Sequence, residues 1–187
     1  MTTIVGISGS LRAGSFNGAL LRTALTEMPA GAALVLGTIK GIPLYDADVE
    51  AAEGLPEAVV RLKEQIVAAD GLLLVTPEYN NSIPGVFKNA IDWLSRPSAD
   101  IARVFGGRPV AVIGSSPGPF GTLLAQSAWL PVLKTLGTQP WFGARLLVSR
   151  AGDAFDATGT LTDARVREHL RGFLAGFSAF VAASQRS

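Results

Sequence analysis

The amino-acid sequence predicts an α/β fold in which a five-stranded parallel sheet carries helices on both faces. Three observations support this prediction. Short apolar segments rich in β-branched residues alternate along the chain with segments of helical periodicity. The segment Leu72–Val75 is apolar at every position, which is typical of a parallel strand buried on both faces. The chain has 187 residues and 48% of them are hydrophobic, enough to bury the core of one domain spanning 1–187.

Each expected strand is a short apolar run bounded by residues that favour turns. The first run ends at serine and glycine, and the third is followed by a segment with two prolines. In chain order, the expected strands are Thr3–Ile7, Ala33–Leu36, Leu72–Val75, Val110–Ile113 and Arg145–Ser149.

Each expected helix repeats its apolar residues every three to four positions. Pro131 is expected to kink or break the fourth helix because proline lacks a backbone N–H. Residues Ala183–Ser187 are expected to form a loose tail after the last helix. In chain order, the expected helices are Asn17–Met28, Glu57–Ala69, Val86–Leu94, Thr122–Leu136 and Asp163–Ala182.

This alternation predicts where a ligand binds. Right-handed crossovers join successive strands into a parallel sheet, and five strands suit the flavodoxin-like order 2-1-3-4-5 better than a six-stranded dinucleotide fold. In such a sheet, ligands bind at the carboxyl ends of the strands, where the strand order reverses between strands 1 and 3. We therefore expect the loops after the first, third and fourth strands to form the site.

The loop Ser8–Asn17 has the chemistry of a phosphate-binding loop. Its glycines allow a tight turn, and its hydroxyl and backbone N–H groups lie at the start of a helix, where an anion is favoured. Arg12 adds a fixed charge with forked donors. The same residues could instead form an ordinary turn in which Ser15 or Asn17 caps the helix. The Walker motif is absent because Ser15 stands where lysine is required, and the G-x-G-x-x-G fingerprint is absent as well.

The other two loops could border a flat heterocycle. Thr76–Gly85 holds an aromatic residue, amides and a carboxylate between two prolines, and its backbone N–H groups could bind the polar edge of a ring. An equally simple interpretation is a proline-rich turn whose Tyr79 packs against a neighbour. Gly114–Gly121 begins with small polar residues and could flank the same ring from the other side.

Three motifs in these loops resemble the NADPH-dependent FMN reductase family. They are GSLRxxSxN at residues 9–17, PEYNxSxPGxxKNAIDWLS at residues 77–95 and SSPGPFG at residues 115–121. With IPLYDADVEAAEGLP at residues 42–56, the resemblance is nearest to the bacterial chromate and quinone reductases and extends from Ile4 to about Val181. It implies an NAD(P)H-dependent FMN reductase.

The resemblance also implies roles for individual residues. The first loop matches the family's FMN-phosphate loop, the second matches the segment bordering the isoalloxazine ring, and one serine of the third matches a further flavin contact. The implied FMN-binding residues are Ser10, Arg12, Ser15, Phe16, Asn17, Pro77, Glu78, Tyr79, Asn80 and Ser115. Lys88, Asn89, Asp92 and Trp93 match a helix that supports the fold and the subunit contacts. Because relatives are dimers or tetramers, a homodimer or homotetramer is expected.

The chain departs from the family pattern beside the expected ring. Asn81 stands where relatives often carry Tyr, Gly or His, and Leu124 stands where they often carry Arg. Thr122 and Leu123 replace an expected Gly-Ala pair. These differences alter the polarity of the pocket that would receive the electron acceptor, and they leave the phosphate loop intact.

The expected reaction follows from the cofactor, because a flavin supplies the hydride chemistry and the protein positions it. NADPH or NADH would donate the hydride, and a small acceptor such as a quinone, a flavin, an azo compound or chromate would then enter the same pocket in ping-pong order. This reaction requires no acid or base in its first half, so no catalytic residue is assigned.

Two other functions are open to the same sequence. Gly114–Gly118 matches the G-x-S-x-G motif of α/β-hydrolases, with Asp153, Asp156 and His169 downstream, but the oxyanion hole would need a backbone N–H from Pro117, which has none. An FMN-binding electron carrier or regulatory flavoprotein is the second alternative. Carriers tend to be strongly acidic so that they can dock basic partners, whereas this chain has a net charge of +1.

Composition narrows the partners and the metals. A net charge of +1 without a basic run argues against nucleic acid binding. The absence of cysteine excludes disulfides and thiolate sites, and a single histidine argues against a zinc centre. The N-terminal segment does not have the pattern of a signal peptide, and no apolar stretch is long enough to span a membrane, so a cytoplasmic location is expected.

Overall fold

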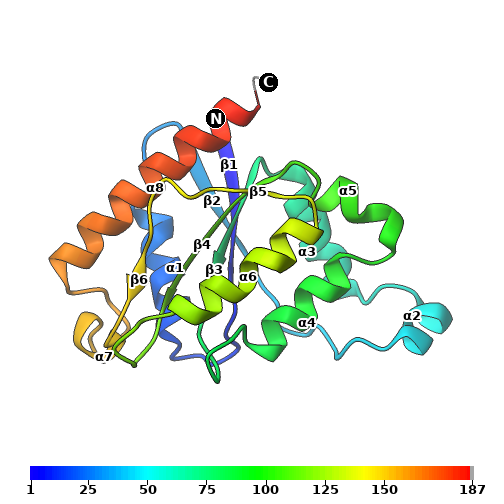
Figure 1. The fold of residues 1–187 in the computed structure, drawn as a ribbon, viewed down its shortest axis with the longest axis horizontal. Helices are drawn as coiled ribbons and strands as arrows, with labels where there is room; N and C mark the ends of the chain where they lie inside the picture. The colour runs from blue at the N-terminus through cyan, green and yellow to red at the C-terminus, as the bar shows by residue number, and fades with distance from the viewer. Residues whose placement is uncertain (186–187) are drawn as a thin grey trace.

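The computed structural model describes residues 1–185 and confirms the predicted α/β class (Figure 1). The sheet is parallel, its strands follow the predicted order β2-β1-β3-β4-β5, and a sixth strand, β6, also pairs with β4. The strands are β1 (Thr2–Ser8), β2 (Ala32–Gly37), β3 (Gly71–Val75), β4 (Pro109–Ser115), β5 (Gln139–Pro140) and β6 (Leu147–Val148).

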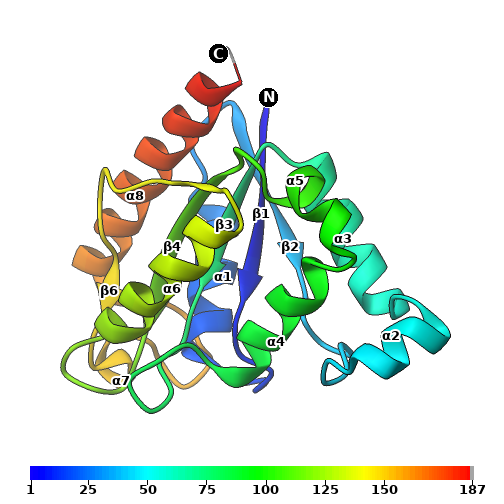
Figure 2. The same cartoon turned by 45° about the vertical axis from the view of Figure 1, so that its right-hand side comes forward.

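Helices cover both faces of the sheet (Figure 1 and Figure 2). Helices α1 and α8 share one buried apolar cluster with the sheet, and α3, α4 and α6 share a second cluster on the opposite face. Strand β3 is buried along its whole length because both of its faces are covered, as its continuous apolar run predicts. The helices are α1 (Phe16–Thr26), α2 (Ala47–Glu53), α3 (Glu57–Ala68), α4 (Gly85–Leu94), α5 (Ile101–Val104), α6 (Leu123–Thr135), α7 (Ala151–Ala154) and α8 (Ala164–Ser184), with a 3₁₀ turn at Ser98–Asp100.

The expected fifth strand is divided into two short strands. β5 pairs with the start of β4, where Pro109 lies opposite Gln139, and β6 pairs with its end, where Gly114 lies opposite Leu147. Between them the chain leaves the sheet after Trp141, whose ring packs edge-on against Phe173 of α8 at a centroid distance of 4.9 Å. The prediction of Arg145–Ser149 therefore located only the second of the two strands.

The structure contradicts a break at Pro131 and a loose tail that begins at Ala183. Pro131 lies inside α6 without ending it, because this residue is on the exposed side of the helix, where water can solvate the carbonyl that loses its donor. Ala183 and Ser184, expected in a loose tail, belong to α8, which is anchored by the fully buried side chain of Val181. The end of the expected tail, residues 186–187, lies outside the described residues.

Several short helices were not expected from periodicity. α2 has no buried residue, so it lacks the apolar stripe that marks a helix in a sequence. α5 and α7 are each a single turn, too short to show a repeat. No helix among residues 1–185 is both long and apolar enough to cross a bilayer.

The register of the sheet aligns the three loops that were expected to form the site. Ser8 at the end of β1 lies opposite Val75 of β3, which in turn lies opposite Ile113 of β4. The chain therefore leaves all three strands at the same edge of the sheet, at the bottom of the view in Figure 1.

Candidate functional site

One cavity at this edge brings together residues from all three loops. Its volume is about 140 Å³. Of the residues expected to bind FMN, only Asn80 lies outside its lining, and the cavity also includes Ser116 and Pro117 of the third loop. The expected residues that line it are Ser10, Arg12, Ser15, Phe16, Asn17, Pro77, Glu78, Tyr79 and Ser115.

The first loop offers backbone donors to an anion. The N–H groups of Leu11, Ala13 and Gly14 donate to no acceptor among residues 1–185. Ser15 is the N-cap of α1, and its hydroxyl oxygen accepts from the N–H groups of Asn17 at 3.2 Å and Gly18 at 3.4 Å. The capping interpretation and the phosphate-loop interpretation are therefore compatible, because the Ser15 cap bonds two N–H groups at the start of the helix and leaves the three loop N–H groups for a ligand.

Arg12 supplies the positive charge of the cavity. Its guanidinium carbon lies 5.8 Å from the centroid of the Phe16 ring. In the described part of the chain, Arg12 forms no salt bridge, so its charge is not neutralised by a protein carboxylate. Arg12 can therefore bind an anionic ligand without first breaking an ion pair.

Asn17 fastens the first loop to the third. Its Oδ1 accepts from the backbone N–H of Ser115 at 2.8 Å, and its Nδ2 donates to the Ser115 carbonyl at 2.8 Å. Both residues are buried. One N–H of the Nδ2 group remains for a ligand, so the side chain can hold the two loops in register and still face the cavity.

Glycine is required where the first loop leaves the sheet. The N–H of Gly9 donates to the carbonyl of Val75 at 2.9 Å. A Cβ added to Gly9 would lie 2.1 Å from Cδ1 of Phe87, a fully buried ring of α4. The loop can therefore pass close to α4 only because this position has no side chain.

The second loop ends in a tight turn. Tyr79 and Ser82 exchange two backbone hydrogen bonds, of 3.1 and 3.0 Å, around Asn80 and Asn81, whose φ angles are 49° and 62°. Asparagine tolerates this left-handed conformation better than most residues, which gives a structural reason for the departure at Asn81. Asn80 occupies the corner of this turn and does not line the cavity, while Tyr79 is 48% exposed at the rim.

Glu78 fastens the second loop to the helix that follows the third. Its Oε2 accepts from the backbone N–H groups of Leu124 at 2.8 Å and Ala125 at 2.9 Å, in the first turn of α6. Thr122, at the N-cap position of this helix, makes no side-chain capping bond. The carboxylate therefore caps a helix from a separate loop, which sequence analysis did not anticipate.

A buried hydroxyl in the cavity fits the expected cofactor. The Oγ of Ser115 is buried and has no hydrogen-bond partner among residues 1–185. Leaving such a group unpaired is costly, and a flavin in the cavity could provide the missing partner. The unpaired loop N–H groups, the free Arg12 charge and this hydroxyl together fit a phosphorylated flavin.

The helix α4 supports a neighbouring segment. Trp93 is fully buried, and its Nε1 donates to the Pro43 carbonyl at 3.0 Å. Asn89 Nδ2 donates to the same carbonyl at 2.8 Å, and its Oδ1 accepts from Tyr45 N at 2.8 Å. These contacts agree with the expected fold-supporting role of this helix.

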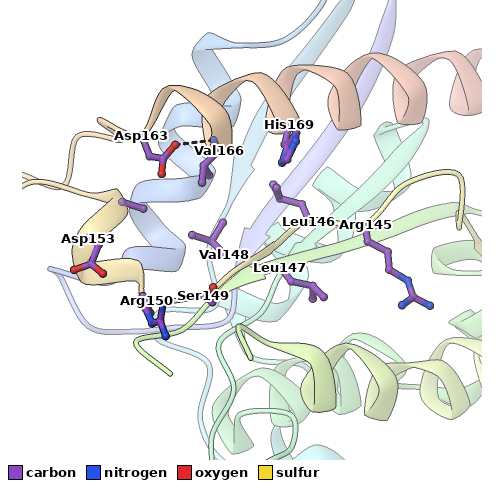
Figure 3. A pocket seen from close by; sticks show the side chains of 11 residues that line it. Arg145, Leu146, Leu147, Val148, Ser149, Arg150, Asp153, Asp163, Val166 and His169 are labelled. Atoms are coloured by element: carbon purple, nitrogen blue, oxygen red, sulfur yellow. Dashed lines mark hydrogen bonds between the residues drawn. The ribbon is translucent and has the colours of Figure 1, made fainter. Parts of the chain in front are cut away.

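The serines of the hydrolase-like motif have no histidine partner. His169 points from α8 into a separate cavity of about 470 Å³, which it shares with Val148 of β6 and Asp153 of α7 (Figure 3). Ser115 and Ser116 line the smaller cavity, and Ser116 Oγ accepts from Gly118 N at 3.2 Å. The larger cavity contains none of the residues expected to bind FMN, so we base the function on the smaller one.

Comparisons with known proteins give the family of this chain. The sequence model of the NADPH-dependent FMN reductase family matches residues 2–153. An NAD(P)H-dependent FMN reductase of Pseudomonas aeruginosa is 49% identical over 165 residues, covering 88% of this chain and 87% of the relative. A quinone reductase of Escherichia coli K12 is 41% identical over 184 residues, covering 95% of this chain and 94% of the relative.

A solved structure shows the same fold. The flavoenzyme NAD(P)H:(acceptor) oxidoreductase of Paracoccus denitrificans superimposes with a TM-score of 0.86 at 35% identity, covering 98% of this chain and 99% of that one. The family match spans most of the chain, and the relatives match nearly end to end. This chain is an enzyme of the NADPH-dependent FMN reductase family.

Proposed function

We propose that the three-loop cavity holds FMN and that the enzyme passes two electrons from NADPH or NADH to a small acceptor of the quinone class. The observation that carries this proposal is the convergence of the expected residues on one cavity that contains a free arginine and an unpaired buried hydroxyl. The chemistry supplied by the bound flavin is hydride acceptance from the nicotinamide and two-electron reduction of the acceptor.

The residues would share the binding of FMN in two groups. The first loop, with Ser10, Ser15 and Arg12, would hold the phosphate at the start of α1, where the helix dipole also favours an anion. Pro77 and Tyr79 would border the ring, and Ser115 would donate its hydroxyl proton to a ring acceptor. The cavity has a volume of about 140 Å³, against roughly 300–1,000 Å³ for typical ligand pockets, so a bound FMN would extend beyond it and part of the ring would stay accessible.

A quinone fits the accessible part of the ring. The rim carries exposed Tyr79, and exposed Phe120 follows in the third loop. Planar aromatic guests bind well against such rings. The E. coli relative is named a quinone reductase, so quinone is the first acceptor to test, with flavin, azo compounds and chromate as further candidates.

We expect NADPH or NADH to bleach the FMN-loaded protein in a single two-electron phase, and benzoquinone to restore its colour. The physical reason is that an accessible ring admits two planar substrates in turn. Stopped-flow absorbance under anaerobic conditions measures both half-reactions. Initial rates with both substrates varied should give parallel double-reciprocal lines.

The same experiment separates the reductase from an electron carrier. A carrier would accept electrons one at a time from a chemical reductant and would not be bleached by either nicotinamide. That result would overturn the enzyme proposal in favour of an FMN-binding carrier. A protein that stays colourless and releases no heat when titrated with FMN would contradict FMN binding itself.

We also propose that the enzyme is a cytoplasmic homo-oligomer, a homodimer or homotetramer. Exposed apolar side chains occur on α4, α6 and the third loop, including Val86, Leu124, Leu130 and Phe120, and a contact between subunits would remove them from water. We expect light scattering at micromolar concentration to give at least twice the monomer mass of 19.4 kDa. A monomer under these conditions would contradict this proposal.

A further inference from the structure

We infer that Glu78 is a positioning residue that holds the Tyr79 rim of the acceptor pocket in place by tying the second loop to α6. The inference rests on the proposed function, because it concerns the same cavity. It begins with the two bonds from Leu124 N and Ala125 N to a single carboxylate oxygen, Oε2. These bonds join residues that are 46 and 47 positions apart in the chain.

The contact replaces a cap that α6 lacks. The first N–H groups of any helix need acceptors from outside the helix. The Thr122 hydroxyl accepts from the Gln126 side chain and from no backbone N–H of the first turn, and the described residues bring only Glu78 to Leu124 N and Ala125 N. A carboxylate at a helix N-terminus also interacts favourably with the helix dipole. The negative charge of Glu78 and its two hydrogen bonds therefore both favour its place at the start of α6.

The contact lies at the edge of the cavity, whose lining includes Glu78 but not Leu124. Glu78 lines the cavity, and the next residue, Tyr79, stands exposed at its rim. Leu124, whose N–H is bonded to Glu78, has a side chain that is itself 46% exposed. The loop after β3 and the start of α6 lie side by side in Figure 2. Trp129 of α6 donates to Thr76 at the start of the loop at 3.1 Å, and the Glu78 contact adds a second tie directly beside Tyr79.

This role differs from that of a flavin ligand. Oε2 accepts two N–H groups of α6, and through this oxygen the carboxylate acts on the substrates by way of the loop and the helix that it joins. The phosphate end of the cavity is held separately by the first loop and by Asn17. Loss of the Glu78 contact should therefore impair acceptor binding more than FMN binding.

The test compares Glu78→Ala with Glu78→Gln. The amide oxygen of glutamine can still accept from both N–H groups, whereas alanine cannot. We expect Glu78→Ala to raise the KM for benzoquinone about ten-fold with kcat reduced less than three-fold, and Glu78→Gln to restore most of the KM. Glu57→Ala is the matched control, because Glu57 is an exposed carboxylate in the first turn of α3, outside the cavity lining.

Amide hydrogen exchange on the FMN-free protein tests the contact independently of the reaction. We expect exchange at Leu124 and Ala125 to be at least ten-fold faster in Glu78→Ala than in the unsubstituted protein or in Glu78→Gln. Unchanged exchange would overturn the inference even if the enzyme is active. Faster exchange with an unchanged KM would overturn the link to the acceptor pocket. If the unsubstituted protein shows no turnover, the proposed function fails, and the exchange result still decides the contact.

Discussion

Asn17→Ala is expected to lower the free energy of unfolding by about 2–6 kcal/mol, because each buried polar group left without a partner costs about 1–3 kcal/mol. The substitution removes both partners of Ser115, whose N–H and carbonyl are bonded to the Asn17 amide at 2.8 Å. Asn17 and Ser115 are 4% and 2% exposed, so water cannot readily replace the lost bonds. Urea unfolding of the FMN-free protein, followed by tryptophan fluorescence, measures the loss.

The chain contains a matched control for this prediction. Asn89 also makes two bonds from its amide to backbone groups, at Tyr45 and Pro43, but these bonds are exposed. Asn89→Ala should therefore cost less, about 1–3 kcal/mol for two ordinary hydrogen bonds that each contribute about 0.5–1.5 kcal/mol. Equal losses for the two variants would show that burial of the Asn17 contact adds nothing to the free energy of unfolding. That result would contradict a stabilising role for the Asn17–Ser115 bonds between the first and third loops.

Arg12→Ala is expected to weaken FMN binding ten-fold or more while leaving riboflavin binding nearly unchanged. A hydrogen bond to a charged group contributes about 1.5–3 kcal/mol, and the Arg12 charge has no carboxylate partner within residues 1–185 that would offset it. Riboflavin lacks the phosphate, so its affinity should not change with the substitution. Isothermal titration with both ligands measures the two affinities.

Two further variants sharpen this experiment. Arg12→Lys keeps the charge but loses the forked donors, so we expect an intermediate affinity for FMN. Arg165→Ala removes an exposed arginine of α8 that does not line the cavity and should leave both affinities unchanged. If Arg12→Ala weakened FMN and riboflavin equally, the first loop would not be the phosphate site.

The order of strands and helices along the chain could be predicted because each element is marked by residues close together in the sequence. Apolar runs and helical periodicity located the four longest strands and the five long helices to within a few residues. The same local signals failed where packing across the sheet decides the outcome. Trp141 packs against α8 and the chain leaves the sheet after it. Pro131 stays within α6 for a different reason, because it lies on the exposed side of the helix.

The candidate site could be predicted only as a set of loops. Parallel topology brings the ends of β1, β3 and β4 together, so the loops that follow them meet whatever their sequences are. Topology does not predict which residue of each loop lines the cavity and which one lies outside it. Asn80, which was expected to border the ring, lies at the corner of a left-handed turn and outside the cavity lining.

By itself, the sequence determined the parallel α/β class, the strand order and the three loops of the site, because hydrophobic period and turn chemistry are read from neighbouring residues. Only the tertiary structure decided how the loops are held together. The contacts of Asn17 with Ser115 and of Glu78 with α6 join residues 98 and 46 positions apart. Such bonds leave no periodic trace in the sequence, and they form because folding places the partner groups within hydrogen-bonding distance and removes water from around them.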